Sequence, residues 1–281
     1  MIIKYFVYVN IICFVGMNNL LAMKISIASK LQCPNQATYE LVEALKKDEV
    51  DKVREALKVV NAQTCVIGTE LYDQIEPKVR TFRLSLLQVA TLFMAEKSIK
   101  ELLTHDIDVN FEDATVQGCQ GHGPALLVLC RTLQPEDQHK GHGILQLLLD
   151  SKANPNIRDI VGTPLTYRVS AGDCESVRLL LGAQAQPNVV MLCRRFDTQR
   201  IEKHILLRAV VHDIEARRGK DDAAIAARVV ILRALLGAGA DPTLCSLEMP
   251  NQGVFQEESA LKVVKDQKLR TLLLQSKTKN E

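Results

Sequence analysis

Cysteine and histidine side chains gather between positions 119 and 142, where their types and spacing could hold a metal ion. The stretch contains two pairs of residues three positions apart, with a fifth residue between them: Cys119 and His122, Cys130, then His139 and His142. Zinc takes four such ligands at about 2.0 to 2.3 Å around one point. A metalloprotein or enzyme that uses the Cys119–His142 stretch is therefore one functional hypothesis.

The elements expected around these residues place the two pairs apart. An apolar helical run begins near Gly123, so that Cys119 and His122 precede the helix and His139 and His142 follow it. A helix of about eight to ten residues covers roughly 12 to 15 Å. The pairs then cannot share one ion, and we expect solvated loop histidines rather than a metal site.

Other signatures of catalysis are missing from the sequence. It contains no His-Glu-x-x-His, no Gly-x-Ser-x-Gly and no Gly-Lys-Ser/Thr phosphate loop. The glycine-rich run Gly118–Gly123 has the wrong order for a dinucleotide loop. We expect a protein that is not an enzyme, with no catalytic residue, no cofactor and no small-molecule substrate.

Four segments of the chain repeat one pattern, an apolar pair followed by a turn and an extended stretch: 101–110, 147–156, 179–188 and 234–243. A second regularity is the spacing of 17 positions between the start of a first helix and the apolar pair of a second helix. This spacing occurs three times: from Tyr39 to Ala56, from Ser85 to Leu102 and from Thr163 to Leu180. Fixed internal lengths of this kind indicate a repeat architecture.

Each part of the pattern has a mechanical reason. Thr163 is expected to cap a helix whose first turn holds Pro164, and Gly172 separates that helix from the next. Gly239 suits a left-handed helix terminus. Three other units carry a costlier residue at that left-handed position: Asp106, Lys152 and Gln184. Each repeat unit is therefore expected to consist of a helix, a turn, a second helix and a β-turn.

This pattern resembles the ankyrin repeat, although Gln88 and Thr166 stand where that family usually has His. The resemblance implies an all-α solenoid of stacked helix-turn-helix units with β-turn finger loops. We expect a leader (1–22), a linker (23–36), a repeat domain (37–275) and a polar tail (276–281). The repeat domain divides into units at about 39–64, 85–110, 123–156, 162–188, 203–243 and 259–275, with Gln134–His142 inserted in the third.

The composition fits packed helices. The sequence has no Trp, 7 Phe and 5 Tyr, so its core must be built from Leu, Val, Ile and Ala. Lys and Arg number 35 against 33 Asp and Glu, a net charge of +2 that is too balanced to predict a nucleic-acid partner. Seven of the eight Cys lie outside the leader, so at least one thiol has no intramolecular partner.

Met1–Ala22 has the features of a secretory signal peptide. Its apolar stretch Tyr5–Val15 is shorter than the roughly 20 residues that span a bilayer. Small residues allow cleavage after Ala22 or Ala28. The sequence therefore predicts an exported protein, secreted or periplasmic.

Two other readings of the leader give other compartments. If residues 5–22 are retained as an anchor, the chain is a membrane-tethered scaffold. If translation starts at Met17 or Met23 instead, the apolar stretch is absent and the protein is cytoplasmic.

The resemblance implies protein partners, of unknown identity, that contact the finger loops and the first helices. Aromatic, Arg and Met side chains contribute most to interfaces. The residues of these types in the finger loops are Phe111, Arg158, Arg194, Arg195, Phe196, Met249 and Phe255. Alternatively, Phe111 and Phe196 pack their fingers onto a neighbour.

Overall fold

The structure is a computed structural model, and it divides the chain into two compact units, Met1–Ile160 and Val161–Glu281. It describes residues 31–71, 79–112, 123–159, 161–194, 201–219, 221–249 and 253–280. Each unit is built from pairs of helices, called here the first and second helix of a pair, with finger segments between successive pairs.

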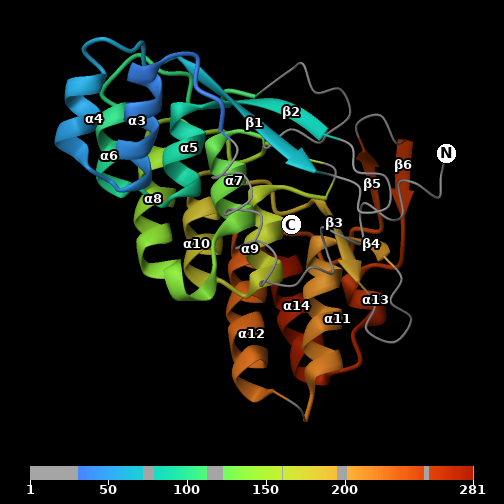
Figure 1. The fold of residues 1–281 in the computed structure, drawn as a ribbon. Helices are drawn as coiled ribbons and strands as arrows, with labels where there is room; N and C mark the ends of the chain where they lie inside the picture. The colour runs from blue at the N-terminus through green and yellow to red at the C-terminus, as the bar shows by residue number, and fades with distance from the viewer. Residues whose placement is uncertain are drawn as a thin grey trace. The chain divides into compact units, whose positions relative to one another are not determined.

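The first unit contains three helix pairs (Figure 1). Its elements are α3 (Gln36–Lys46), α4 (Val50–Ala56), β1 (Cys65–Leu71), β2 (Val79–Ser85), α5 (Leu86–Leu92), α6 (Glu96–Leu102), α7 (Ala125–Thr132), the 3-10 turn η1 (Pro135–Asp137) and α8 (Gln138–Asp150). The first helices α3, α5 and α7 pack side by side, and so do the second helices α4, α6 and α8.

The second unit continues the same plan. Its elements are α9 (Pro164–Ala171), α10 (Cys174–Gly182), β3 (Val190–Arg194), β4 (Ile201–Ile205), α11 (Leu206–Arg217), α12 (Asp222–Gly237), β5 (Ser246–Met249), β6 (Gly253–Gln256), α13 (Ala260–Val263) and α14 (Gln267–Asn280). The second helices α10, α12 and α14 pack in series, and α11 packs on α13.

Short polar side chains cap three of the first helices, α3, α5 and α9. Thr163 caps α9 with Pro164 in its first turn, which confirms the prediction from the sequence. Ser85 caps α5 in a capping box with Gln88. Asn35 caps α3, so this helix begins at Gln36, inside the segment assigned to the linker.

A residue with positive φ turns the chain from the first to the second helix in four pairs. It is Asp48 at φ 53°, Met94 at φ 56°, Gly172 at φ 76° and Gly219 at φ 71°. At position 172 a side chain would be strained at this φ, and its Cβ would lie 2.0 Å from Nη1 of Arg228, which would have to move. Gly172 therefore separates α9 from α10, as the sequence predicts.

The second helices end in the left-handed region at Lys152, Gln184 and Gly239, as expected. At the first of these, the N–H of Ala153 bonds the carbonyl of Leu148 at 2.9 Å. The equivalent prediction for Asp106 is wrong, because its φ is not positive. There the carbonyl of Leu102 accepts from the N–H of His105 at 3.0 Å, so the turn closes earlier and needs no left-handed residue.

The insertion Gln134–His142 is not the loop that its composition predicts. After η1 the chain enters α8 at Gln138, so His139 and His142 are helical. Gly141 lets α8 approach α7 closely, since a Cβ at this position would be 2.2 Å from Cδ1 of Leu133. The extra residues therefore lengthen the second helix at its N-terminal end.

The cores consist of aliphatic side chains, as the composition predicts. Among the described residues, no buried hydrophobic side chain is Phe or Tyr. Residues with no exposed surface include Leu41, Leu45, Leu86, Leu126, Ile144, Leu165, Val177, Leu180, Ile231 and Leu235. Each such side chain stabilises the fold by about 1.5 to 3 kcal/mol relative to exposure.

Within each unit, asparagine amides connect one finger to the segment that ends the next second helix. Asn110 Nδ2 donates to the carbonyl of Lys152 at 3.1 Å, and its Oδ1 accepts from the N–H of Asn154 at 2.7 Å. Asn188 makes an equivalent bond to the carbonyl of Gly239 at 3.3 Å. These bonds fix the starts of the fingers relative to the helices that follow.

Candidate protein-binding surface

Three of the fingers are antiparallel β-hairpins: β1 with β2, β3 with β4, and β5 with β6. In the first hairpin, Val66 pairs with Leu84 and both are fully buried. The next residue, Ile67, is 43% exposed and lies opposite the exposed Arg83. The base of this finger thus packs on the core with one face and presents the other to solvent.

A buried polar cluster fixes the base of the second hairpin. Glu257 Oε1 accepts from the N–H of Ile205 at 2.5 Å, and Glu257 Oε2 lies 2.8 Å from Nδ1 of His204. Arg208 Nη1 is 3.0 Å from the same Oε2 and also contacts Nδ1 of His204. Because Glu257 directly follows β6, one carboxylate connects the bases of two hairpins.

Gln88 connects two units of the repeat in a similar way. Its Oε1 accepts from the N–H of Ser85 at 2.6 Å, and its Nε2 donates to the carbonyl of Gly123 at 2.5 Å. Thr166 bonds only within its own turn, where its hydroxyl accepts from the N–H of Thr163 at 2.8 Å and donates to the Thr163 carbonyl. The residue that replaces the usual His therefore supplies a cross-unit bond at Gln88 and a local one at Thr166.

The residues predicted as partner anchors lie on different fingers. Arg194 is on β3 opposite Ile201, and Met249 is on β5 opposite Gly253. Phe255 is on β6. The remaining pair, Arg195 and Phe196, lies outside the described residues.

Phe111 lies at the base of its finger and is half-buried. Its N–H donates to the carbonyl of Asp108 at 3.2 Å, and its carbonyl is 3.5 Å from Nε2 of Gln88. These contacts hold the Phe111 backbone against the first helix α5. A role in packing the finger therefore fits Phe111 as well as a role in binding.

Arg158 follows α8 on the shortest finger and is also half-buried. Burial lowers the pKa of its guanidinium, and the neighbouring Asp159 carboxylate opposes that shift. The Asp159 Oδ2 atom lies 3.9 Å from Nη1 of Arg131, on α7. Two arginines are therefore grouped around one carboxylate on this finger.

The metal hypothesis receives no support from the described residues. Cys119 and His122 lie outside them, Cys130 is fully buried in α7, and His139 and His142 are on the first turns of α8. In the parts of the chain that the structure describes, no three Cys, His, Asp or Glu residues are grouped as metal ligands.

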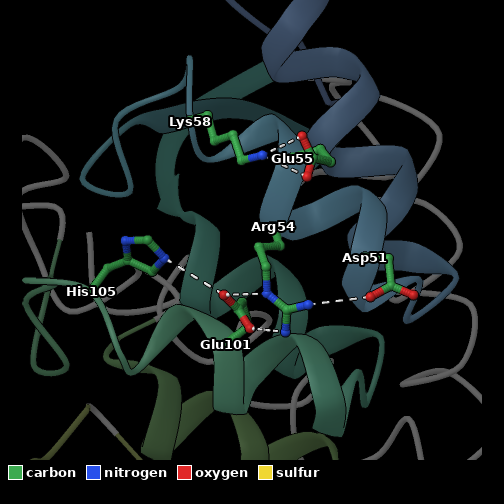
Figure 2. Close-up of polar contacts among 6 residues, drawn as sticks. All are labelled: Asp51, Arg54, Glu55, Lys58, Glu101 and His105. Atoms are coloured by element: carbon green, nitrogen blue, oxygen red, sulfur yellow. Dashed lines mark hydrogen bonds and ion pairs between the residues drawn. The ribbon is translucent and has the colours of Figure 1, made fainter.

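A charged cluster on the second helices α4 and α6 was not predicted from the sequence (Figure 2). Arg54 Nη2 lies 2.7 Å from Oε2 of Glu101, and Arg54 Nε lies 3.2 Å from Oε1. This bidentate hydrogen bond raises the pKa of Arg54 and lowers the pKa of Glu101. Further pairs surround it: Asp51 with Arg54, Glu55 with Lys58, and Glu101 with His105.

The charges of this cluster are paired with one another. In the cluster of Figure 2, each charged side chain already faces an opposite charge on the same chain. No signal in the sequence identifies the Arg54–Glu101 pair, since 47 positions separate the two residues. The alternation of acidic and basic residues along 49–58 indicates only a solvated helix face.

Helix pairs connected by hairpin fingers define a helical repeat protein. No family model matches the sequence, and no curated protein matches it either. Among solved structures, an ankyrin repeat domain from Acinetobacter baumannii is similar at a TM-score of 0.55 and 20% identity, covering 85% of this chain and 98% of that one. The human ASB11 ankyrin repeat domain has a TM-score of 0.41 and 16% identity, covering 87% of this chain and 98% of its own.

The fold assignment rests on the first of these two structures. The chain has the all-α ankyrin repeat fold, with its strands in the fingers, which confirms the resemblance seen in the sequence. None of the helices that the structure describes is long and apolar enough to cross a bilayer.

Proposed function

We propose that this protein is a non-catalytic scaffold that recognises a protein partner through its finger loops and first helices. Repeat folds bury their core between neighbouring units and expose an extended surface, which suits recognition. Ankyrin repeat domains are generally protein–protein interaction modules. The partner is a protein rather than a nucleic acid, since the net charge is +2.

The observation that carries this proposal is the construction of the hairpins. At their bases Val66, Leu84, Val190 and Ile205 are almost fully buried. Farther from the core, Ile67 and Arg83 are exposed. A rigid base with exposed side chains beyond it reduces the conformational entropy that binding costs.

The predicted anchors Arg195 and Phe196 provide the test. Affinity capture with the natural chain as bait is compared with capture by the double variant Arg195→Glu, Phe196→Ala. The double variant should retain the melting temperature of the natural chain and lose its captured protein. A matched control is Arg233→Glu, at an exposed position on the second helix α12. Unchanged capture by the double variant, or an equal loss in the control, contradicts the proposal.

Export is a further part of the proposal. It is supported by the leader at residues 1–22, with its short apolar stretch and small residues before the cleavage positions. N-terminal sequencing of the protein from its natural source should find Met23 or Ser29 at the N-terminus. A mature chain that begins at Met1 supports a retained leader instead and removes the argument for export.

A further inference from the structure

Helix α12 has an exposed face with few charges. The helix packs on α10, α11 and α14. Its remaining side, called here the α12 face, consists of the exposed residues Asp222, Ala223, Ala226, Val230, Arg233 and Gly237. At 3.6 residues per turn, these residues fall within about 100° of one another around the helix axis. Val230, in the middle of the face, is 51% exposed although its side chain is large and apolar.

The two charges of the α12 face lie at its opposite ends. Asp222 is in the first turn and Arg233 is eleven positions later, about 16 Å along the axis. Charges on one helix pair at spacings of three or four, as Glu55 and Lys58 do on α4. Among the residues that the structure describes, neither Asp222 nor Arg233 has an ion-pair partner. Their spacing prevents them from pairing with each other.

A face with unlike charges at its two ends is complementary to a second copy that is turned end for end. In a two-fold interface, each residue contacts its counterpart in the second copy reciprocally. If the axis passes between Ala226 and Val230 and the two helices run antiparallel, Arg233 of each copy lies beside Asp222 of the other. Val230 then lies against Ala226 of the second copy, whose small side chain allows the helix axes to approach to about 8 Å.

We propose that the α12 face binds a second copy of this chain in an antiparallel, two-fold interface. Two ion pairs, one at each end, fix the direction of the helices, and the uncharged residues between them form the contact. The helix has 16 residues and is about 24 Å long, so the interface is small and the dimer is weak. The inference is independent of the proposed function, which uses the fingers and the first helices.

Charge reversal tests the ends of the interface. Sedimentation equilibrium of the full chain over a wide range of concentrations should show a reversible rise in mass from one chain toward two. Arg233→Asp places two acids together at each end, and Asp222→Arg places two arginines there. Each variant should raise the dissociation constant by about tenfold or more, because like charges face each other. Lys58→Asp, a charge reversal on the second helix α4, should leave it unchanged.

A mixture of the two reversed chains separates a specific interface from a loss of folding. In a heterodimer of Arg233→Asp with Asp222→Arg, unlike charges face each other again at both ends. The equimolar mixture should therefore associate about as strongly as the natural chain, although each variant alone is monomeric at the same concentration. A variant that failed to fold would gain nothing from the mixing.

Three results would overturn the proposal. They are a natural chain that stays monomeric at every concentration, reversed variants that associate as the natural chain does, and a mixture that does not associate. An equal loss in Lys58→Asp would also overturn it, because general charge effects would then explain the result. Arg233→Glu, the control for partner capture, should lose self-association and retain capture, so the two proposals can fail separately.

Discussion

Arg54 and Glu101 face each other across two neighbouring second helices in a bidentate pair, with N–O distances of 2.7 and 3.2 Å. The Arg54 side chain is 52% exposed and the Glu101 side chain 15%. The acid is thus the less hydrated partner. Its interaction with Arg54 connects α4 to α6 through charge in addition to apolar packing.

The pair makes stability depend on pH in a defined direction. The pKa of Glu101 is lower in the folded chain than in the unfolded one, because the carboxylate accepts from Arg54. Its contribution is complete above the unfolded pKa, which is about 4.3. As the pH falls through the folded pKa, the contribution is lost.

Glu101→Gln should therefore lower the melting temperature slightly at pH 7, and the difference from the natural chain should shrink below about pH 4. Thermal unfolding of both chains between pH 7 and pH 3 measures this. Glu55→Gln is the control, since Glu55 and Lys58 are both largely exposed. A difference that persists unchanged at low pH would assign the effect to packing.

Gly172 should tolerate no side chain, for two separable reasons. Gly172→Ala places a Cβ at φ 76° and 2.0 Å from Nη1 of Arg228. We expect the free energy of unfolding to fall by about 2 kcal/mol or more. Gly219→Ala has the backbone strain alone, since φ is 71° and no atom lies within 4 Å of the new Cβ. Gly237→Ala has neither the strain nor the steric contact. Urea unfolding should rank the variants in that order, and equal losses at 172 and 219 would contradict the steric part.

The local features of the fold could be predicted from the sequence because neighbouring residues determine them. Thr163 and Pro164 start a helix through groups in its own first turn. Gly239 ends one through its own backbone freedom. The spacing of apolar pairs then identifies the repeat, since the same contacts recur between units.

Contacts between distant segments could not be predicted in this way. Glu257 contacts His204 across 53 positions, and no feature of the residues next to Glu257 in the sequence indicates this contact. His142 lies in α8, where Gly141 allows a close approach to Leu133, and the composition of the segment does not reveal this packing. Of the predicted anchors, Phe111 and Arg158 have side chains that the structure describes, and both are half-buried.

Thiol reactivity should follow burial along the chain. Cys245 is exposed and Cys130 is buried. Desolvation raises the pKa of Cys33 and Cys174, so less of each is the reactive thiolate at pH 7. Of the five cysteines whose side chains the structure describes, iodoacetamide labelling followed by mass spectrometry should modify Cys245 first and Cys130 last in the native chain.

The pH dependence of labelling checks the cause. The rates at Cys33 and Cys174 should continue to rise with pH above the usual thiol pKa, about 8.5, because their own pKa values are higher. In urea the native differences should largely disappear. If Cys174 is labelled as fast as Cys245 in the native chain at pH 7, burial does not raise the pKa of the Cys174 thiol.

Glu257 should contribute more to stability than its neighbour Glu258. Glu257→Gln keeps an oxygen that accepts from the N–H of Ile205 but removes the charge that faces Arg208 and His204. An arginine then lies largely buried without its carboxylate, which should lower the free energy of unfolding by about 1 to 3 kcal/mol. Glu258→Gln should change it by less than about 0.5 kcal/mol, since Glu258 is 56% exposed in its pair with Lys262.

Hydrogen exchange shows where the loss from Glu257→Gln is felt. Because Glu257 bonds the end of β4 directly, amides of β3 and β4 should exchange faster in this variant than in Glu258→Gln. Amides of α5 and α6, which belong to the first unit, should exchange as in the natural chain. Faster exchange throughout both units would indicate a global loss of stability and contradict a specific role for Glu257 in fixing the finger base.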